Sequence, residues 1–467
     1  MLLHLRRHRA ARAGSAPAWL ALVGVATGLF AGCGGGGSSP PAPAPPSNVL
    51  VVVLDDWGAD MFARSGIHPD APPTPTLDAL ADAGVYFRRF YVAPTCSPTR
   101  SQVLTGRYNF RTQLGEPINH WQNEAALALD EVTIAEVLDN AAPTPVATAA
   151  IGKWHLGSLS VGDLDHATLQ GFDWFAGTLG NLVFGDTFAQ YTKTVNGAVQ
   201  ASSTYVTTDQ VDDALARITA SPEPWCVYLG FNAPHQPFHA PPSALHTQTL
   251  AGNPNLTPNA HYRAAVEAVD TELGRLLAAL PSDVRARTTV IVLGDNGTPN
   301  EAITAPSVNN QNKGTLFEGG VNVPLIVAGP TVAQPGRTSD ALVHAVDVFP
   351  TVADLLRTDA RAGVGDNRPI DGRSLAALLE SPTAPPVRTT IFHQRFAPNG
   401  PPPYASEAWM VRDARWKLIR RVGQADQFYD LQGLAREGAS LDVSALNSEQ
   451  QAAYDALVLE LAAVLGS

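Results

Sequence analysis

Short runs of apolar residues recur along the chain and alternate with longer amphipathic stretches. All but one of these runs are almost entirely apolar, the exception being residues 85–92 with Arg88 and Arg89, and such runs predict strands that are buried on both faces of a sheet. The predicted strands are residues 49–54, 85–92, 147–151, 226–231, 289–293 and 324–328.

The stretches between these strands carry helical periodicity. One predicted helix begins after Thr74, with Pro75 at its first position, and ends at Gly84. Another covers residues 261–280, where apolar side chains recur on one face. Strands that alternate with helices predict an α/β sandwich.

The pattern changes near residue 385. Residues 409–412 and 416–420 predict a hairpin, residues 427–431 a further strand, and residues 448–465 a final amphipathic helix. We therefore expect a large catalytic domain over residues 48–384. A small α+β subdomain with an antiparallel sheet and a helix should follow over residues 385–467.

The N-terminal segment predicts export. Residues 1–33 combine a basic start with an apolar run, 18–30, which is too short to span a bilayer comfortably. The run ends in Leu29-Phe30-Ala31-Gly32-Cys33, which resembles a bacterial lipoprotein cleavage box and predicts lipidation of Cys33; plain secretion with cleavage nearby is the alternative. Residues 34–47 are rich in Gly, Ser, Pro and Ala, a composition typical of a linker. Membrane attachment is expected only through the lipid.

Composition and net charge reduce the number of plausible function classes. The net charge of −12 argues against a nucleic-acid partner, and it means that an anionic substrate requires a locally basic pocket. The chain has three cysteines, Cys33, Cys96 and Cys226. So few cysteines suit individual chemical roles better than disulfides, and Cys226 lies in an apolar run that predicts a buried strand residue.

Polar clusters follow closely after five of the predicted strands. Ligand sites in open α/β sheets gather at the carboxyl ends of strands, so five such clusters predict one common site. The clusters are Asp55-Asp56, Cys96 in the loop after residue 92, Lys153-Trp154-His155, Ala233-Pro234-His235 and Asp295-Asn296.

Four of these residues predict a metal site. Asp55, Asp56, Asp295 and Asn296 offer three carboxylates and an amide oxygen. Oxygen ligands of this kind suit Ca²⁺ or Mg²⁺, whereas zinc prefers histidine and cysteine. We predict Ca²⁺, with Mg²⁺ as the alternative.

Cys96 opens the most specific motif in the chain. Cys96-Ser97-Pro98-Thr99-Arg100, followed by Leu104-Thr105-Gly106, resembles the signature of the type I sulfatases, which belong to the alkaline phosphatase superfamily. The resemblance extends from residue 48 to residue 441, and further motifs occur in family order. These are Gly152-Lys153-Trp154-His155-Leu156-Gly157, Pro234-His235 with Pro237, Lys313-Gly314 with Glu318-Gly319-Gly320, and Phe428-Tyr429-Asp430-Leu431.

The resemblance implies a fold and a chemistry. The fold would be an alkaline-phosphatase-like sandwich with a central mixed sheet flanked by helices. A formylglycine-generating enzyme would oxidise Cys96 to formylglycine (3-oxoalanine), whose hydrated diol ligates the metal and attacks sulfur. The activity would be that of a sulfuric ester hydrolase of the arylsulfatase type.

The resemblance also implies residue roles. Arg100 and Lys153 would hold the diol, and His155 would be the base that triggers its collapse to the aldehyde. His235 and Lys313 would bind sulfate and protonate the leaving oxygen. His239 is a rival for His235 by its closeness in sequence, although we expect it to be structural. The segment 119–121, which contains His120, is a candidate for lining the substrate pocket.

Two alternatives remain open from the sequence. A phosphonate or phosphate ester hydrolase of the same superfamily would share the metal and the anion pocket. A non-catalytic binder of sulfated glycans would keep the shell with Cys96 unoxidised. The expected substrate is a sulfated small molecule or glycan, and the expected location is the periplasm, the outer membrane or the cell surface.

Overall fold

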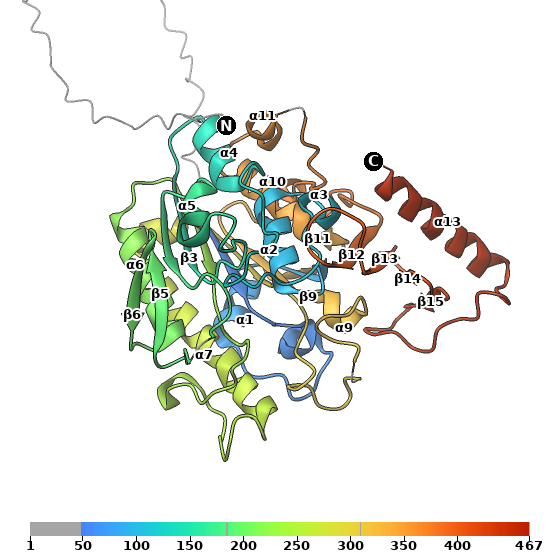
Figure 1. Cartoon of the computed structure of the whole chain (residues 1–467), viewed down its shortest axis with the longest axis horizontal. Coiled ribbons are helices and arrows are strands. Elements are labelled where there is room, and N and C mark those ends of the chain that lie inside the picture. The colour runs from blue at the N-terminus through green and yellow to red at the C-terminus, as the bar shows by residue number, and fades with distance from the viewer. Residues whose placement is uncertain (1–47, 184, 309, 366, 467) are drawn as a thin grey trace, which may run out of the picture. The chain divides into compact units, whose positions relative to one another are not determined.

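A mixed sheet of eleven strands lies at the centre of the fold (Figure 1). The structure is a computed structural model that describes residues 48–183, 185–308, 310–365 and 367–466. In sheet order the strands are β10 (Arg337–Ser339), β2 (Gly84–Tyr91), β9 (Asn322–Ala328), β8 (Thr288–Gly294), β1 (Asn48–Leu54), β7 (Trp225–Gly230), β3 (Ala147–Gly152), β4 (Trp174–Gly177), β5 (Tyr191–Val195) and β6 (Ala198–Ser202), with β11 (Val343–His344) paired to β2.

Parallel pairing dominates the middle of this sheet. β1 lies between β7 and β8, parallel to both, and β3 is parallel to β7. β9 is antiparallel to β8 and also to β2, so β2 runs in the same direction as β1. The carboxyl ends of β1, β2, β3, β7 and β8 therefore point to one edge of the sheet. The predicted α/β fold with a mixed sheet is confirmed.

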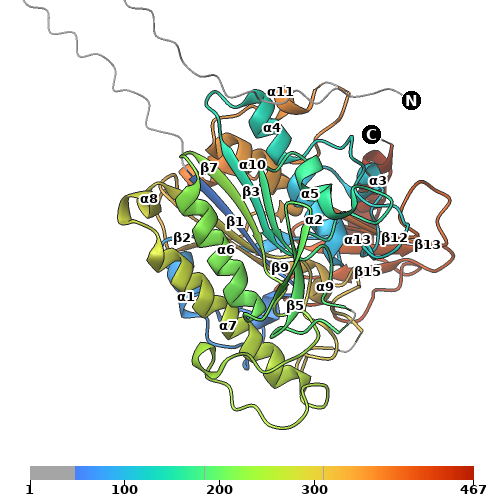
Figure 2. The ribbon, with the colours of Figure 1, turned by 60° about the vertical axis from the view of Figure 1, so that its left-hand side comes forward.

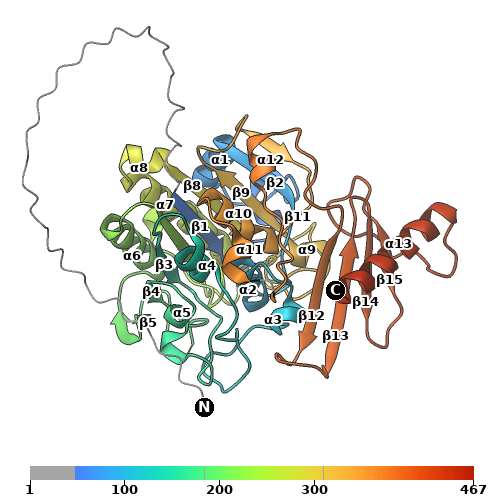
Figure 3. The same cartoon turned by 90° about the horizontal axis from the view of Figure 1, so that it is seen from above.

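Helices cover both faces, as the alternation along β1 demonstrates. Val51 and Val53 pack into one core, and Leu50 and Val52 pack into the other. Burying such side chains contributes roughly 1.5–3 kcal/mol each. Figure 2 shows α6 and α7 along one face, and Figure 3 shows α10 and α2 on the opposite side of the sheet.

The helices divide between the two cores. The face of Leu50 is covered by α1 (Pro75–Asp82), α6 (Val206–Ala220) and α7 (Pro258–Ala279). The face of Val51 is covered by α2 (Cys96–Thr105), α4 (Ile134–Ala141), α10 (Val348–Leu355) and α12 (Ala376–Glu380). Shorter helices are α3 (Asn109–Thr112), α5 (His166–Leu169), α8 (Ser282–Ala286), α9 (Glu318–Val321) and α11 (Ala360–Val364).

The C-terminal part forms a second sheet with one long helix, as predicted (Figure 3). Met410 and Val411, neighbours on one strand, pack into different cores, so both faces of this sheet are covered. The domain boundary at residue 385 stays a prediction. The elements are β12 (Ile391–Ala397), β13 (Ser406–Arg412), β14 (Trp416–Arg421), β15 (Gln427–Asp430) and α13 (Ser448–Leu465).

The apolar pattern did not predict the hairpin β5–β6. β6 is largely exposed, so it carries no run of buried apolar residues. The local signal is its turn, Asn196-Gly197, whose two residues both have positive φ angles, 45° and 79°. Asn-Gly is the preferred pair for such a hairpin turn, and it was the feature that could have located these strands.

The N-terminal predictions fall outside the described residues. Both the signal segment 1–33, with Cys33, and the linker 34–47 precede Asn48, where the description starts. Among the described helices, none combines the length and the apolar character that crossing a membrane requires.

We expect the folded protein to lose stability in acid because of the buried His166. Its Nδ1 accepts a hydrogen bond from Trp154 Nε1 at 2.9 Å, and its Nε2 lies 2.9 Å from the Leu127 carbonyl, so the folded protein holds the neutral ring. Burial lowers the pKa of His166 to about 4, below the value of about 6.5 in an unfolded chain. The unfolded state therefore binds a proton that the folded state does not, and stability falls as pH drops below about 6.5.

The expected size is about 2 kcal/mol from this one residue between pH 7.5 and pH 5. Denaturant unfolding of the wild type and of His166→Gln at both pH values measures it. The variant should be less stable at pH 7.5 but should lose less stability on acidification. Equal losses in both proteins would contradict the neutral, buried state of His166.

Candidate active site

The structure brings the predicted polar clusters together at the carboxyl edge of the parallel strands. Asp55 and Asp56 follow β1, and Asp295 follows β8 next to it. The Asp56 backbone N–H donates to Asp295 Oδ1 at 2.9 Å, which fixes the two strand ends against each other. All three carboxylates are fully buried.

Cys96 is the first residue of α2 and lies at the same edge. Its Sγ is 3.4 Å from Asp55 Oδ1, and its side chain is 1% exposed. Burial and the Asp55 carboxylate both raise the pKa of the thiol. Residue 96 also sits where the unpaired backbone N–H groups of a helix N-terminus favour a bound anion.

Arg100 lies one turn further along α2 and joins three elements. Its Nε and Nη2 donate to Asp295 Oδ2 at 3.0 and 2.8 Å, and its Nη1 donates to the Lys153 carbonyl at 2.7 Å. Its Nη1 also contacts the Tyr228 hydroxyl at 3.3 Å. Arg100 therefore holds α2, β3 and β8 in register around residue 96.

Two lysines neutralise the aspartates of β1. Lys153 Nζ pairs with Asp55 Oδ2, and Lys313 Nζ pairs with Asp56 Oδ2 at 2.7 Å. Burial alone would raise the pKa of Asp55, but Lys153 and the other nearby cations hold it well below its usual range. Lys313 is the more accessible of the two lysines, with 21% of its side chain exposed.

His235 faces this cluster through one ring nitrogen. Its Nδ1 donates to the Gln236 carbonyl at 2.6 Å, which leaves Nε2 toward Asp56 Oδ2 at 3.8 Å. Burial, and secondarily Lys313, lower the pKa of His235 to about 4. The neutral ring can therefore offer a lone pair to a cation, whereas binding an anion requires a proton on Nε2.

His155 presents a free base. Its Nε2 donates to the Ile118 carbonyl at 2.7 Å, so Nδ1 carries the lone pair, and that atom is buried without a hydrogen-bond partner. Burial first, and then Lys153 and Arg100, lower the pKa of His155. The residue has a positive φ of 63°, an uncommon backbone conformation that tertiary contacts must hold.

Gly152 makes the turn into this segment. Its φ is +83°, and a Cβ at this position would meet the Gly230 carbonyl oxygen at 2.0 Å. Only glycine fits there, because the backbones of β3 and β7 approach so closely. The next residues, Lys153 and His155, are thereby directed to the site.

The cluster has the donors for a divalent cation. Ligand atoms of Asp55, Asp56, Cys96 and His235 lie within 4.8 Å of one another. Asn296 adds a buried Oδ1 that has no hydrogen-bond partner. Crowded buried carboxylates are costly without a cation: burial and Asp55 raise the pKa of Asp295. Most donors are oxygens, which fits Ca²⁺ or Mg²⁺.

Two details differ from the predicted ligand set. Asp295 lies beside the cluster, but its oxygens accept from Arg100 and from the Asp56 N–H. His235 was predicted to bind sulfate and protonate the leaving oxygen, not to bind the metal, and its nitrogen lies within the cluster. The metal roles of all the predicted ligands, Asp55, Asp56, Cys96, Asp295 and Asn296, stay predictions.

Sequence reasoning missed residues that hold the site from a distance. The Tyr262 hydroxyl on α7 donates to the Asp56 carbonyl at 2.7 Å. Arg436 pairs with buried Asp60 at 3.1 Å and donates to Asn312 Oδ1 at 3.2 Å, which ties the C-terminal part to the residue before Lys313. No local pattern marks these residues, because their partners are far away in sequence.

The other candidates take structural places. The His239 ring stacks on Phe188 with centroids 3.7 Å apart, so the structural interpretation of His239 holds. His120 is buried, with Nδ1 3.2 Å from the Gly157 carbonyl. Its neighbour Trp121 is 39% exposed. The pocket-wall role of this segment stays a prediction.

Cys226 is buried in β7, as predicted.

Fold and site together define an α/β protein with a buried cluster of acidic and basic side chains at the carboxyl edge of its sheet. The chain belongs to the sulfatase family: the family model described as Sulfatase matches residues 47–358. A second model, described as N-sulphoglucosamine sulphohydrolase, C-terminal, matches residues 310–463.

Curated relatives agree with this family. Arylsulfatase J of Mus musculus is 28% identical over 364 residues, which cover 74% of this chain and 58% of the relative. N-acetylgalactosamine-6-sulfatase of Canis lupus familiaris is 29% identical over 368 residues, covering 71% of this chain and 66% of the relative. The match thus spans less than two thirds of the length of these relatives.

Solved structures share the fold. Ps i-CgsB in complex with k-i-k-neocarrahexaose superposes with a TM-score of 0.72 at 24% identity, covering 89% of this chain and 92% of that one. A protein in complex with its substrate D-glucosamine-2-N,6-O-disulfate has a TM-score of 0.70 at 18% identity, with 89% and 97% coverage.

Proposed function

We propose that this protein hydrolyses sulfate esters to an alcohol and sulfate. One observation carries the proposal: Cys96 begins a buried helix within hydrogen-bonding distance of Asp55, inside a cluster that also holds Lys153 and Lys313. Such a place combines a reactive residue, a cation site and two positive charges for an anionic ester.

The charges of the site favour this reaction. Three buried carboxylates, Asp55, Asp56 and Asp295, are balanced by Arg100, Lys153 and Lys313. A bound divalent cation, for which we propose Ca²⁺, would make the net charge of the pocket positive. It would also polarise the oxygen atoms of the sulfate group. Formylglycine at residue 96, made by a formylglycine-generating enzyme, would supply the nucleophilic oxygen.

In this proposal some of the remaining side chains position the reacting groups, and others bind sulfate or transfer protons. Arg100 and Lys153 hold residue 96 in place, since both donate to groups that surround it. Lys313 and His235 lie on the Asp56 side, where they would bind the sulfate oxygens and give a proton to the leaving alcohol. His155, with its free Nδ1, would accept the proton whose removal releases sulfate.

The reaction itself is tested with purified protein and Ca²⁺. We expect release of 4-nitrophenol from 4-nitrophenyl sulfate, together with an aldehyde at residue 96 by peptide mass spectrometry. Hydrolysis of 4-nitrophenyl phosphate or of a phosphonate ester faster than of the sulfate would favour the phosphoryl alternative. A protein that binds sulfated sugars with an unmodified Cys96 and no turnover would refute the proposed function.

The two histidines should respond differently to the leaving group. General acid or base help is worth about 10²–10⁴-fold, so His235→Ala should slow an alkyl sulfate by that factor. It should slow 4-nitrophenyl sulfate much less, because nitrophenolate needs little protonation to leave. His155→Ala should slow both substrates similarly, after a burst of one alcohol per site. Rapid-quench measurement of alcohol release tests this, and the opposite assignment of the burst would show that the roles are reversed.

Location and substrate complete the proposal. We infer export from residues 1–33, with lipidation of Cys33 and attachment at the outer membrane or cell surface, and periplasmic release as the alternative. Mass analysis of the mature N-terminus tests both. Relatives with names such as N-acetylgalactosamine-6-sulfatase favour a sulfated glycan or a sulfated small molecule as the substrate.

A further inference from the structure

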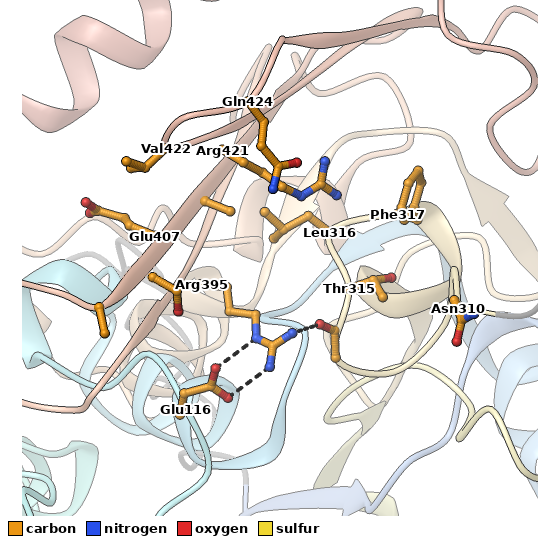
Figure 4. A pocket seen from close by; sticks show the side chains of 14 residues that line it. Glu116, Asn310, Thr315, Leu316, Phe317, Arg395, Glu407, Arg421, Val422 and Gln424 are labelled. Atoms are coloured by element: carbon orange, nitrogen blue, oxygen red, sulfur yellow. Dashed lines mark hydrogen bonds and ion pairs between the residues drawn. The ribbon is translucent and has the colours of Figure 1, made fainter.

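A pocket of about 490 Å³ lies between the C-terminal sheet and the loop that follows Lys313 (Figure 4). This volume is within the range of sites that hold small molecules. The catalytic body contributes Glu116 and the segment 314–317, and the C-terminal sheet contributes Arg395, residues 405–408 and the turn after β14.

Two residues that line the pocket are close in sequence to residues of the proposed sulfate site. Gly314 lines it, and the preceding residue is Lys313, which pairs with Asp56. Glu116 lines it as well, and Ile118, two residues further on, accepts the hydrogen bond from His155. The pocket and the proposed sulfate site are therefore built partly from the same two chain segments.

One of the two arginines in the pocket has a structural task. Arg395 Nε donates to Glu116 Oε1 at 3.0 Å, and its Nη1 donates to the Gly314 carbonyl. Figure 4 shows these contacts converging on the Arg395 guanidinium. Arg395 thus braces the loop of Lys313 against β12, and its charge is compensated.

Arg421 differs, because no carboxylate of the described residues forms an ion pair with it. Its Nη1 donates to the Gln427 side-chain oxygen, and its guanidinium lies 5.8 Å from the centre of the Phe317 ring. It is half-buried at the end of β14. Gln424 of the following turn reaches toward the same space in Figure 4, so the two side chains offer amide and guanidinium N–H groups together.

The acid in the pocket wall does not cancel this charge. Glu407 accepts a hydrogen bond from Gln394 Nε2 at 2.6 Å. In Figure 4 its carboxylate points to the opposite side from the Arg421 guanidinium. Arg421 is therefore an uncompensated cation in a protein whose net charge is −12, and it faces a cavity next to the sulfate site.

We propose that this pocket binds a second acidic group of the substrate, on a sugar residue joined to the one that carries the scissile sulfate. Arg421 recognises that group, a carboxylate or a second sulfate, with Gln424 beside it. A planar guanidinium pairs with either anion through two parallel hydrogen bonds. The substrate class is then an acidic, sulfated oligosaccharide. The inference rests on the proposed sulfate ester hydrolysis.

The test compares ligands with one and with two acidic groups. The probes are N-acetylgalactosamine 6-sulfate, a chondroitin disaccharide with one sulfate and one uronate carboxylate, and a carrageenan disaccharide with two sulfates. Calorimetry with the wild type and with Arg421→Gln, in the presence of Ca²⁺, gives Kd for each probe. 4-Nitrophenyl sulfate turnover is measured in parallel.

Arg420→Gln is the matched control. It removes the same charge from the neighbouring position on β14, whose side chain points to the other face and pairs with Asp426 at 2.6 Å. Gln424→Ala is a second variant from the pocket. It keeps the proposal testable should Arg421→Gln fail to fold.

We expect Arg421→Gln to raise Kd at least about tenfold for one or both disaccharides, as is typical for the loss of a hydrogen bond between charged groups. Kd for the monosaccharide, and 4-nitrophenyl sulfate turnover, should change less than about twofold. Arg420→Gln should change neither. An effect confined to the chondroitin probe identifies the carboxylate as the second group, and one confined to the carrageenan probe identifies a sulfate.

Three results would overturn the proposal. The first is a wild type that binds no disaccharide more tightly than the monosaccharide. The second is an equal weakening of all probes by Arg421→Gln. The third is an unchanged Kd for every probe in both Gln424→Ala and Arg421→Gln. Failure of the proposed function is separate, because it appears as absent 4-nitrophenyl sulfate turnover in the wild type, while calorimetry still reports on the pocket.

Discussion

Replacing Cys96 with alanine is expected to abolish sulfate ester hydrolysis while leaving the fold intact. Removal of a reacting side chain typically costs on the order of 10⁴–10⁶-fold in turnover. Alanine suits the first turn of α2, and the lost Sγ makes only a contact of 3.4 Å with Asp55, so the helix should persist. Turnover of 4-nitrophenyl sulfate and the melting temperature of the purified variant measure the two effects.

Cys226→Ala is the matched control for this result. Cys226 is the other described cysteine, and it is buried in β7 within the apolar core. The control should lose some stability through the missing side chain but keep its activity. Comparable turnover by Cys96→Ala and the wild type would remove residue 96 from the chemistry.

Metal removal should have the second largest effect. Chelation is expected to lower turnover by about 10²–10⁴-fold, since the cation supplies several kcal/mol of charge stabilisation, and Ca²⁺ or Mg²⁺ should restore it. Ca²⁺ should also raise the melting temperature, because a ligand that binds only the folded state stabilises it. Asp295→Ala should lose both responses, and added metal should not rescue it.

A buried carboxylate elsewhere in the fold serves as the control. Asp270 on α7 accepts hydrogen bonds from the backbone N–H groups of Thr76 and Leu77 at 3.0 and 2.8 Å. Asp270→Asn should lower stability without changing the response to Ca²⁺. Because Asp295→Ala also removes the nearest carboxylate partner of the buried Arg100, Asp295→Asn is measured beside it. Full activity in a metal-free preparation would refute the metal requirement.

The sequence by itself determined the elements and the edge at which they meet. The runs that became β1, β3, β7, β8 and β9 were visible because a strand buried on both faces must be apolar throughout. The last helix was predicted with the bounds that α13 has, since its apolar stripe is a local signal. Parallel strands share one carboxyl edge, so the meeting of Asp55, Lys153 and Asp295 followed from the order of the elements.

Only the tertiary structure decided the partners within that edge. Arg100 pairs with Asp295 across 195 residues, and Tyr262 reaches the Asp56 carbonyl across 206. The free Nδ1 of His155 depends on the Ile118 carbonyl that occupies its other nitrogen. Hydrophobic periodicity is a local property, whereas each of these contacts depends on how separate loops pack. For the same reason the sequence could not reveal the pocket of Arg421, whose walls come from segments more than 300 residues apart.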